Sequence, residues 1–340
     1  MKAGTVLVTG GAGFIGSHVV DHLVANGASV VVLDDLSSGS IDNLSRSLAT
    51  HKVKFLRGSV LDEQALGSAV TNCTSVIHMA VECVRRSIGD PLKNHHINAT
   101  GTILTLEAAR KAKIEKFVYC SSSEIYGNSS SKTLNERTSV PAPTTVYGAA
   151  KYIGEHYTHA YRQTYGMQTT VVRPFNAFGP REHHRGDLAE VIPRFMIRLV
   201  NGLEPIIFGD GLQGRDFTHV TDVARGIVLA LQESKSVGEV INIARGEVVS
   251  IGRLAKIMAR LIGRADLNPI YMTERPGDVR TLHADVAFAQ ELLNYKANVT
   301  LSDGLSNYIK WFQETYSEPH LLLETIHENW NLPADELQTS

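Results

Sequence analysis

Short runs of apolar residues recur along the first half of the chain, and longer segments that carry Ala and Leu separate them. These runs occupy residues 6–9, 29–33, 53–56, 75–78, 116–120 and 169–173. Continuous apolar runs of this length are typical of strands buried on both faces of a parallel sheet, and the segments between them are long enough for helices. The pattern predicts an α/β fold with a doubly wound parallel sheet.

The rhythm changes after Pro174, where longer polar loops such as residues 179–187 appear. We therefore predict two domains and a tail. The first would cover residues 1–173 with a return segment near 216–245, the second would be a smaller, interleaved α/β substrate-binding domain mainly at 174–330, and the tail would be 331–340.

Composition limits the kinds of protein that this chain can be. With 340 residues, 43% hydrophobic and 20% charged, it can bury one large or two modest cores. Its net charge of −2 gives no sign of a nucleic-acid or membrane-surface partner, and no apolar run reaches transmembrane length. The chain starts without a signal-peptide pattern and has only three cysteines, so we expect a reduced, cytoplasmic protein.

A glycine-rich turn lies between the first predicted strand and the helix expected at residues 17–24. In Gly10-Gly-Ala-Gly13-Phe-Ile-Gly16, the first glycine would allow a tight turn, the second a close approach to a pyrophosphate, and the third helix packing. The second predicted strand ends in Asp34, about 20 residues further on, as a dinucleotide fingerprint requires. A carboxylate there binds ribose hydroxyls and repels a 2′-phosphate, and Asp35 strengthens this preference for NAD over NADP.

Tyr147 and Lys151 are four residues apart in a segment that is predicted to be helical. At this spacing both side chains lie on one helix face. A tyrosine is a poor base at its free pKa of about 10, but a nearby cation favours the phenolate. The pair is therefore a candidate proton shuttle, although such a pair is more often an ordinary helix surface.

Many ordered motifs resemble the extended short-chain dehydrogenase/reductase superfamily, specifically its NAD-dependent nucleotide-sugar epimerases and dehydratases, among them UDP-glucose and UDP-glucuronate 4-epimerases. The matching segments extend over nearly the whole chain. They are residues 9–16, 34–39, 78–80, 98–102, 121–127, 147–151, 173–176, 209–217 and 275–278.

The resemblance implies a role for each matching residue. Tyr147 would be the base, Lys151 its electrostatic partner, and Ser122 the hydroxyl that orients the sugar. The residues expected at the NAD cofactor, besides Tyr147 and Lys151, are Gly10, Gly13, Phe14, Ile15, Gly16, Asp34, Asp35, Ser37, Ser38, Gly39, Ser59, Val60, Met79, Ala80, Val81, Asn98 and Pro174. Those expected at the nucleotide-diphosphate sugar are Ser122, Ser123, Asn176, Val191, Phe208, Gln213, Arg215, Arg275 and Asp278.

Two positions depart from the family pattern. The chain has Ser59 where the family has an aspartate that holds the adenine, and Asp62 could compensate. Glu124 stands where simple 4-epimerases have a small or neutral residue and several dehydratases and decarboxylases have a glutamate. It could remove the C5 proton of a 4-keto sugar, or it could only anchor a loop.

The resemblance implies a 4-epimerase that oxidises C4 of a UDP-hexose or UDP-hexuronate transiently and reduces the 4-keto intermediate on its other face. The alternative is a dehydratase or decarboxylase that uses Glu124. A remote alternative from another class is a non-catalytic NAD-sensing protein. The family also implies a homodimer formed through the helices near residues 102–111 and 147–165.

Other groups of residues with possible chemistry gave weaker hypotheses. Arg85 and Arg86 could bind a hexuronate carboxylate, but a solvated charge pair is the better interpretation. The adjacent histidines at 95–96 and 183–184 lack further ligands, so we expect no metal site, although the loop at residues 181–187 could reach the substrate.

Overall fold

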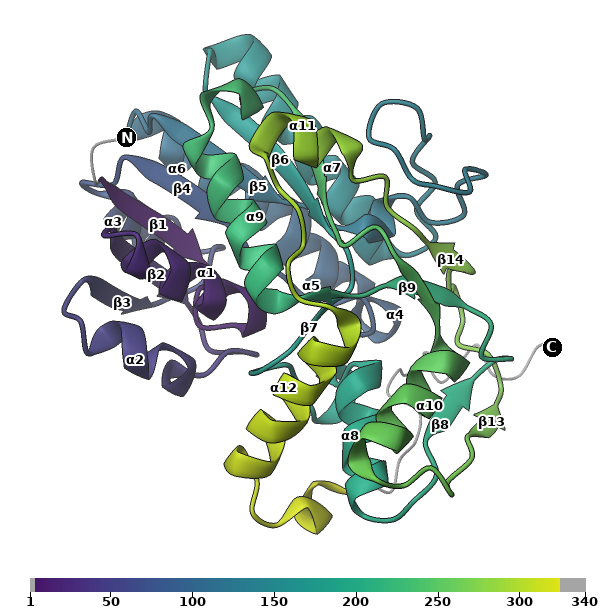
Figure 1. The fold of residues 1–340 in the computed structure, drawn as a ribbon. Helices are drawn as coiled ribbons and strands as arrows, with labels where there is room; N and C mark the ends of the chain where they lie inside the picture. Colours follow the sequence, from purple (N-terminus) through teal and green to yellow (C-terminus); the bar gives the residue numbers. More distant parts are fainter. Residues whose placement is uncertain (1–3, 325–340) are drawn as a thin grey trace.

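The computed structural model describes residues 4–324 and is built around a seven-stranded sheet with parallel neighbours in the order β11-β6-β5-β4-β1-β2-β3 (Figure 1). The strands of this sheet are β1 (Thr5–Thr9), β2 (Ser29–Asp34), β3 (Val53–Arg57), β4 (Ser75–His78), β5 (Lys116–Cys120), β6 (Thr169–Pro174) and β11 (Val240–Ile243). All six strands predicted in the first half of the chain are present. The predicted α/β class with a parallel sheet is therefore confirmed.

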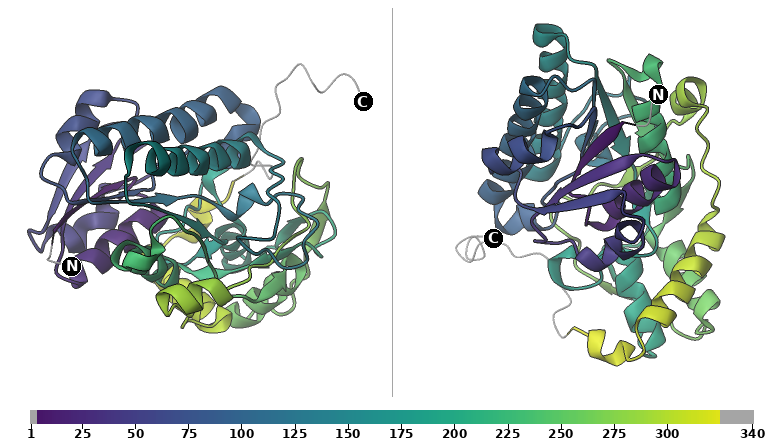
Figure 2. Two further views of the ribbon diagram at one scale, coloured as in Figure 1. Left: turned by 90° about the horizontal axis from the view of Figure 1, so that it is seen from above. Right: turned by 90° about the vertical axis from the view of Figure 1, so that its left-hand side faces the viewer.

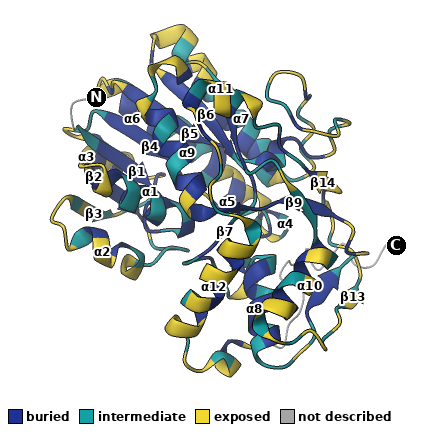
Figure 3. Ribbon diagram, in the orientation of Figure 1, coloured by how far each residue is buried: buried dark blue, intermediate teal, exposed yellow. Residues whose placement is uncertain are grey.

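Helices cover both faces of this sheet, which is why its strands are apolar throughout (Figure 2). One face is covered by α1 (Phe14–Ala25), α9 (Val220–Gln232) and α11 (Ala287–Leu293). The other face is covered by α3 (Glu63–Val70), α6 (Gly101–Lys111) and α7 (Val146–Tyr165). Figure 3 shows buried residues along the sheet and exposed ones on the outer sides of these helices.

A second hydrophobic cluster joins three helices on the other side of the molecule (Figure 1). These helices are α8 (Val191–Val200), α10 (Ile251–Ile262) and α12 (Leu301–Thr315), and Phe195, Met258 and Phe312 pack between them. The short strands of this region are β7 (Ala177–Phe178), β8 (Ile206–Phe208), β9 (Gly214–Asp216), β10 (Thr218–His219), β12 (Val248–Ser250), β13 (Ile270–Met272) and β14 (Thr281–Leu282).

Short helices complete the described chain and connect the longer elements. They are η1 (Ile41–Leu44), α2 (Ser45–Leu48), α4 (Arg86–Gly89), α5 (Pro91–His95), η2 (His96–Thr100), η3 (Ser123–Ile125), η4 (Gly186–Leu188), η5 (Ser234–Ser236) and η6 (Pro319–Leu322). Within residues 4–324, none of the helices combines the length and the apolar character that crossing a membrane requires.

The chain returns to the large sheet after it has entered the second hydrophobic cluster. Helix α9 packs on α1, and β11 pairs with β6 through Ile241 and Val172. Both elements lie within the return segment expected near residues 216–245. The division into two domains remains a prediction, and the expected tail at 331–340 lies outside the described residues.

A buried ion pair holds α7 against the ends of the central strands. Arg173 on β6 donates two hydrogen bonds to Glu155 on α7, with Nε to Oε1 at 2.9 Å and Nη2 to Oε2 at 2.6 Å. Both side chains are about 95% buried. Ser121, at the end of β5, donates to the same carboxylate, and Arg173 also donates to the Tyr126 hydroxyl. The network fixes α7 relative to β5 and β6.

Replacement of Arg173 by Met should lower the free energy of unfolding by about 3–5 kcal/mol, because the Glu155 carboxylate would stay buried without its partner. Urea denaturation measures this change. Lys310→Met, which breaks an exposed pair with Glu314 on α12, is the control and should leave the urea midpoint unchanged. Equal midpoints for Arg173→Met and the wild type would contradict the role given to the pair.

Candidate active site

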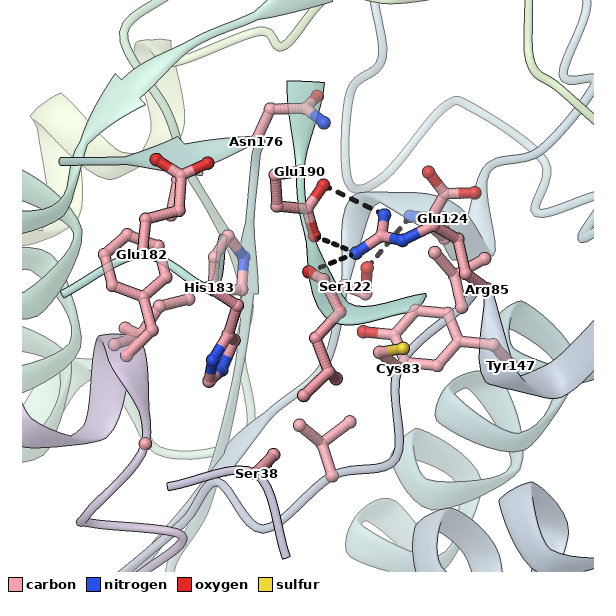
Figure 4. Close-up of a pocket in the computed structure, with 18 of the residues that line it drawn as sticks. Ser38, Cys83, Arg85, Ser122, Glu124, Tyr147, Asn176, Glu182, His183 and Glu190 are labelled. Carbon is pink, nitrogen blue, oxygen red and sulfur yellow. Dashed lines mark hydrogen bonds and ion pairs between the residues drawn. The ribbon is translucent and has the colours of Figure 1, made fainter. Parts of the chain in front are cut away.

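A large pocket opens beyond the carboxyl ends of the sheet strands and extends toward the second hydrophobic cluster (Figure 4). Strands β1 and β4 are neighbours in this sheet, and the strand order reverses between them. Ligands of open α/β sheets bind at such a switch point. Residues from the glycine turn, from the ends of β2, β4 and β5, and from α7 all line this pocket.

The glycine turn forms one end of the pocket. Gly10 has φ of +69° and donates its N–H to the Leu33 carbonyl at 2.9 Å, so it makes the tight turn. A Cβ on Gly16 would lie 2.1 Å from the Gly10 carbonyl oxygen, so only glycine allows α1 to start this close to the turn. Gly13 caps α1 without a side-chain hydrogen bond. The first-turn N–H groups can therefore bind a diphosphate, as NAD requires.

Asp34 lies at the end of β2 in the wall of the same pocket. Its two carboxylate oxygens accept hydrogen bonds from the backbone N–H groups of Ala12 and Leu36, each at 2.9 Å. Burial raises the pKa of Asp34, and these two hydrogen bonds oppose the rise. The carboxylate is thus held in a fixed orientation beside the glycine turn, where ribose hydroxyls of a dinucleotide can donate to it.

Asp62 is not placed to substitute for Ser59 in the pocket lining. Asp62 accepts hydrogen bonds from the N–H groups of Gln64 and Ala65 and caps α3, and it does not line the pocket. Our suggestion that Asp62 compensates for Ser59 was therefore wrong. Ser59 and Val60 do line the pocket.

Tyr147, Ser122 and Lys151 come together at the middle of the pocket. Burial raises the pKa of Tyr147 above its usual value, and a hydrogen bond between the Tyr147 and Ser122 hydroxyls opposes this shift. Burial also lowers the pKa of Lys151 to about 8. The Lys151 ammonium lies 4.6 Å from the centre of the Tyr119 ring. Desolvation therefore works against both charged forms of the Tyr–Lys pair.

Two arginines converge on one carboxylate further along the pocket. The Nη2 atoms of Arg215, on β9, and Arg275 lie 2.7 Å and 2.5 Å from the same oxygen of Asp278. The two arginines and the single aspartate together carry one net positive charge, which would attract a diphosphate. Asn176, in the same wall, has a buried side-chain oxygen that makes no hydrogen bond to the described residues.

Glu124 lies in η3 and points into the same part of the pocket (Figure 4). Burial raises its pKa, and the positive charges of Arg215 and Arg275 oppose this shift. The carboxyl also contributes to the raised pKa of Tyr147, which shows that the two groups are close enough to interact.

Nearly all predicted site residues line this one pocket. Gly39 and Asn98 do not. Gly39 packs against the glycine turn, where an added Cβ would lie 2.8 Å from Ala12. Asn98 is buried in the π-helix η2 and bonds to both backbone groups of Glu82, so it positions the loop after β4.

Four charged residues of the pocket were not among the predicted site residues. They are Arg85, Glu182, Glu190 and Arg194. Arg85 is only 4% exposed and binds Glu190, so our interpretation of it as a solvated charge was wrong. We expected that the loop at residues 181–187 could reach the substrate, but no pattern in the sequence indicated that Glu190, just after this loop, pairs with Arg85.

Comparison with known proteins identifies the family. The sequence model described as "NAD dependent epimerase/dehydratase family" matches residues 6–244. The chain belongs to this family. Among curated relatives, the putative UDP-glucose 4-epimerase of Methanocaldococcus jannaschii is 35% identical over 312 residues, which are 91% of this chain and 98% of the relative.

Solved structures of epimerases share the fold of this family member. The UDP-glucose 4-epimerase of Thermotoga maritima, solved with UDP-glucose, has a TM-score of 0.86 and 36% identity, covering 92% of this chain and 99% of its own. The UDP-glucuronic acid 4-epimerase of Bacillus cereus, solved with UDP-glucuronic acid and NAD, has a TM-score of 0.86 and 31% identity, covering 92% and 100%. The expected family is therefore confirmed.

Replacement of Asp34 by Ala should weaken NAD binding by at least about tenfold, because hydrogen bonds from ribose hydroxyls to the carboxylate would be lost. Isothermal titration calorimetry of the purified protein with NAD measures the affinity. Asp62→Ala is the matched control, since that aspartate caps α3 outside the pocket, and its NAD affinity should not change. Equal weakening by both variants would contradict the assignment of Asp34.

Proposed function

We propose that this protein is an NAD-dependent 4-epimerase of a UDP-linked hexose or hexuronate. The observation that supports this proposal is that the glycine turn, the Tyr147–Ser122 pair and the Arg215–Arg275 pair line one continuous pocket. A dinucleotide on the glycine turn and a diphosphate on the two arginines would meet at the tyrosine. The epimerases named above, which share the fold, are solved with the corresponding ligands.

In the proposed reaction, Tyr147 takes the proton of the C4 hydroxyl, and Ser122 orients that hydroxyl through its own. NAD supplies a reversible hydride acceptor at C4. Lys151, one helical turn from Tyr147, lowers the cost of the negative phenolate through its ammonium. Arg215 and Arg275 hold the diphosphate while the 4-keto sugar turns, and Tyr147 returns the proton after the other face has been reduced.

Because burial raises the pKa of Tyr147, this residue needs nearby positive charge in order to act as a base. Desolvation keeps the phenol protonated in the free pocket and lowers the pKa of Lys151 to about 8. Positive charge beside the phenol must therefore outweigh desolvation when the ligands bind. The His78 imidazole near Lys151 adds none, because complete burial lowers its pKa to about 3 and keeps it neutral.

Tyr147→Phe should lower kcat on the best UDP-sugar by about 10²- to 10⁴-fold, because the proton acceptor is removed while the ring keeps its place. NAD affinity should stay close to that of the wild type. The assay follows interconversion of C4 epimers by NMR. Tyr271→Phe, which removes the hydroxyl of an exposed tyrosine on β13 outside the pocket lining, is the control and should keep the turnover of the wild type. Unchanged turnover in Tyr147→Phe would exclude the proposed base.

A lyase on the same scaffold is the second candidate, and the position of Glu124 in the pocket favours it. Incubation of each UDP-sugar in deuterated water tests it, with NMR and mass readout of the product. For an epimerase we expect a C4 epimer with no deuterium at C5, because that carbon is never deprotonated. Deuterium at C5, loss of water or loss of the C6 carboxylate would instead support a lyase, and Glu124→Gln should then abolish that product.

Assembly as a homodimer through α6 and α7 is also part of the proposal. Ala108 on α6 and Ala149 on α7 are half-buried in the single chain, and small side chains allow helices to approach closely. Near the N-terminal end of α7, Val146 is 39% exposed, and near its C-terminal end Tyr165 is 53% exposed. Covering such apolar groups would support pairing of these faces.

A further inference from the structure

Two loops meet beside the reacting end of the pocket, and a buried arginine joins them. Arg85, in the loop after β4, donates to both carboxylate oxygens of Glu190, which precedes α8, at 2.8 Å and 3.1 Å. It also donates to the carbonyls of Asp187 and Leu188 at 2.6 Å and 2.8 Å. Four hydrogen bonds thus occupy this guanidinium. Its partner Glu190 is close enough to Glu124 to raise the pKa of that carboxyl, and Glu124 in turn acts on Tyr147.

The remaining basic residues of the pocket are committed elsewhere. Lys151 lies on α7, one helical turn after Tyr147, and serves that tyrosine in the proposed reaction. Arg215 and Arg275 both bind Asp278 at the proposed diphosphate site. Arg194, on α8, lies 5.8 Å from the centre of the Phe208 ring. His183 is kept neutral, since burial lowers its pKa. Arg215 and Arg275 also act on Glu124, but the proposed diphosphate and Asp278 occupy them. Among the described residues that line the pocket, Arg85 is therefore the cation whose availability Glu190 controls.

Glu190 is close to two other glutamates of the pocket, Glu124 and Glu182. Glu124, Glu182 and Glu190 all line it. The Arg85 guanidinium holds the pKa of Glu190 below its usual value, so Glu190 is ionised, whereas burial raises the pKa of Glu124 and of Glu182. Arg85 and Glu190 together carry no net charge. Glu124 and Glu182 offer hydrogen bonds to hydroxyl groups and no attraction for an anion.

In a hexuronate, the C6 carboxylate is attached to C5, the neighbour of the reacting C4. In the proposed complex it would lie near Tyr147 and Glu124, and Glu190 is close enough to Glu124 to raise its pKa. With Arg215 and Arg275 occupied by the proposed diphosphate and Arg85 by Glu190, an anion in this position would find no free cation among these three and would face the ionised Glu190. The hydroxymethyl group of a neutral hexose meets no such repulsion.

We propose that Glu190 is a specificity-determining residue, which occupies the guanidinium of Arg85 and thereby makes the site select neutral hexoses and reject hexuronates. This inference rests on the proposed epimerase function. It assigns Glu190 a role that a purely structural link between two loops would not have, because a structural link would affect all substrates alike.

The experiment compares kcat/KM for UDP-glucose, UDP-N-acetylglucosamine and UDP-glucuronate in the wild type and in Glu190→Gln. In the wild type, the better neutral sugar should exceed UDP-glucuronate by at least about tenfold. In Glu190→Gln, the negative charge is lost and one N–H group of Arg85 loses its acceptor, because an amide NH₂ group cannot accept, so the ratio should shift toward UDP-glucuronate by at least about tenfold. The ratio within one enzyme does not depend on the fraction of folded protein.

Two further variants separate selectivity from loop stability. Asp187→Asn weakens the neighbouring ion pair with Arg86, whose side chain is partly exposed and lies outside the pocket lining, and should leave the ratio unchanged. Arg85→Gln combined with Glu190→Gln removes the freed cation and should lose the gain in UDP-glucuronate turnover. If Glu190→Gln does not fold, the same ratio of kcat/KM values can be measured in Glu190→Ala. The preference of the wild type for neutral sugars tests the inference without any substitution.

The outcomes distinguish this inference from the proposed function. Preference of the wild type for UDP-glucuronate, or an unchanged ratio in a folded Glu190 variant, overturns the role of Glu190 and leaves the epimerase proposal standing. Absence of turnover for all three sugars in the wild type overturns the epimerase proposal and this inference with it. A shift that the Arg85→Gln/Glu190→Gln double variant reverses supports the role.

Discussion

The buried ion pair between Glu155 and Arg173 is the interaction on which the geometry of the site depends. It connects α7, which carries Tyr147 and Lys151, to β6. The same network includes Ser121 at the end of β5 and Tyr126, whose hydroxyl donates to Asn242 on β11. Because Ser122 follows Ser121 directly, the position of the Ser122 hydroxyl relative to Tyr147 is set by contacts that lie behind the pocket. Such support keeps reacting groups in place without occupying the site itself.

Desolvation is the second constraint, and it acts on every ionisable group at the reacting centre. Burial disfavours the Tyr147 phenolate and the Lys151 ammonium alike, so the pair does not form an ion pair spontaneously in the free pocket. This differs from the simple expectation that a nearby lysine makes the tyrosine acidic. The advantage of such a site is that its charge state responds strongly to what binds, since opposite charges attract more strongly where water is excluded.

The sequence predicted most of the fold and much of the candidate site for physical reasons that can be stated. Strands buried on both faces must be apolar along their whole length, and the turn at Gly10 and Gly16 has no room for a side chain. The pairing of Arg85 with Glu190 joins residues 105 positions apart, and no local pattern reports such a contact. The roles expected for Asp62 and Asn98 were wrong for a similar reason. Asp62 caps α3 and Asn98 binds the backbone of Glu82, and a comparison of motifs does not detect such hydrogen bonds.

The fate of a 4-keto sugar in this pocket depends on the charge of Glu124, and that charge is coupled to the diphosphate site. Burial raises the pKa of Glu124, while Arg215 and Arg275 pull it down. A bound diphosphate neutralises these two arginines, so that burial then prevails and the carboxyl becomes more strongly protonated. Removal of the C5 proton requires the carboxylate form, whereas a protonated carboxyl can only donate a hydrogen bond. If the substrate binds as proposed, its binding would thus disable the base that elimination needs, so the position of Glu124 in the pocket is compatible with epimerisation.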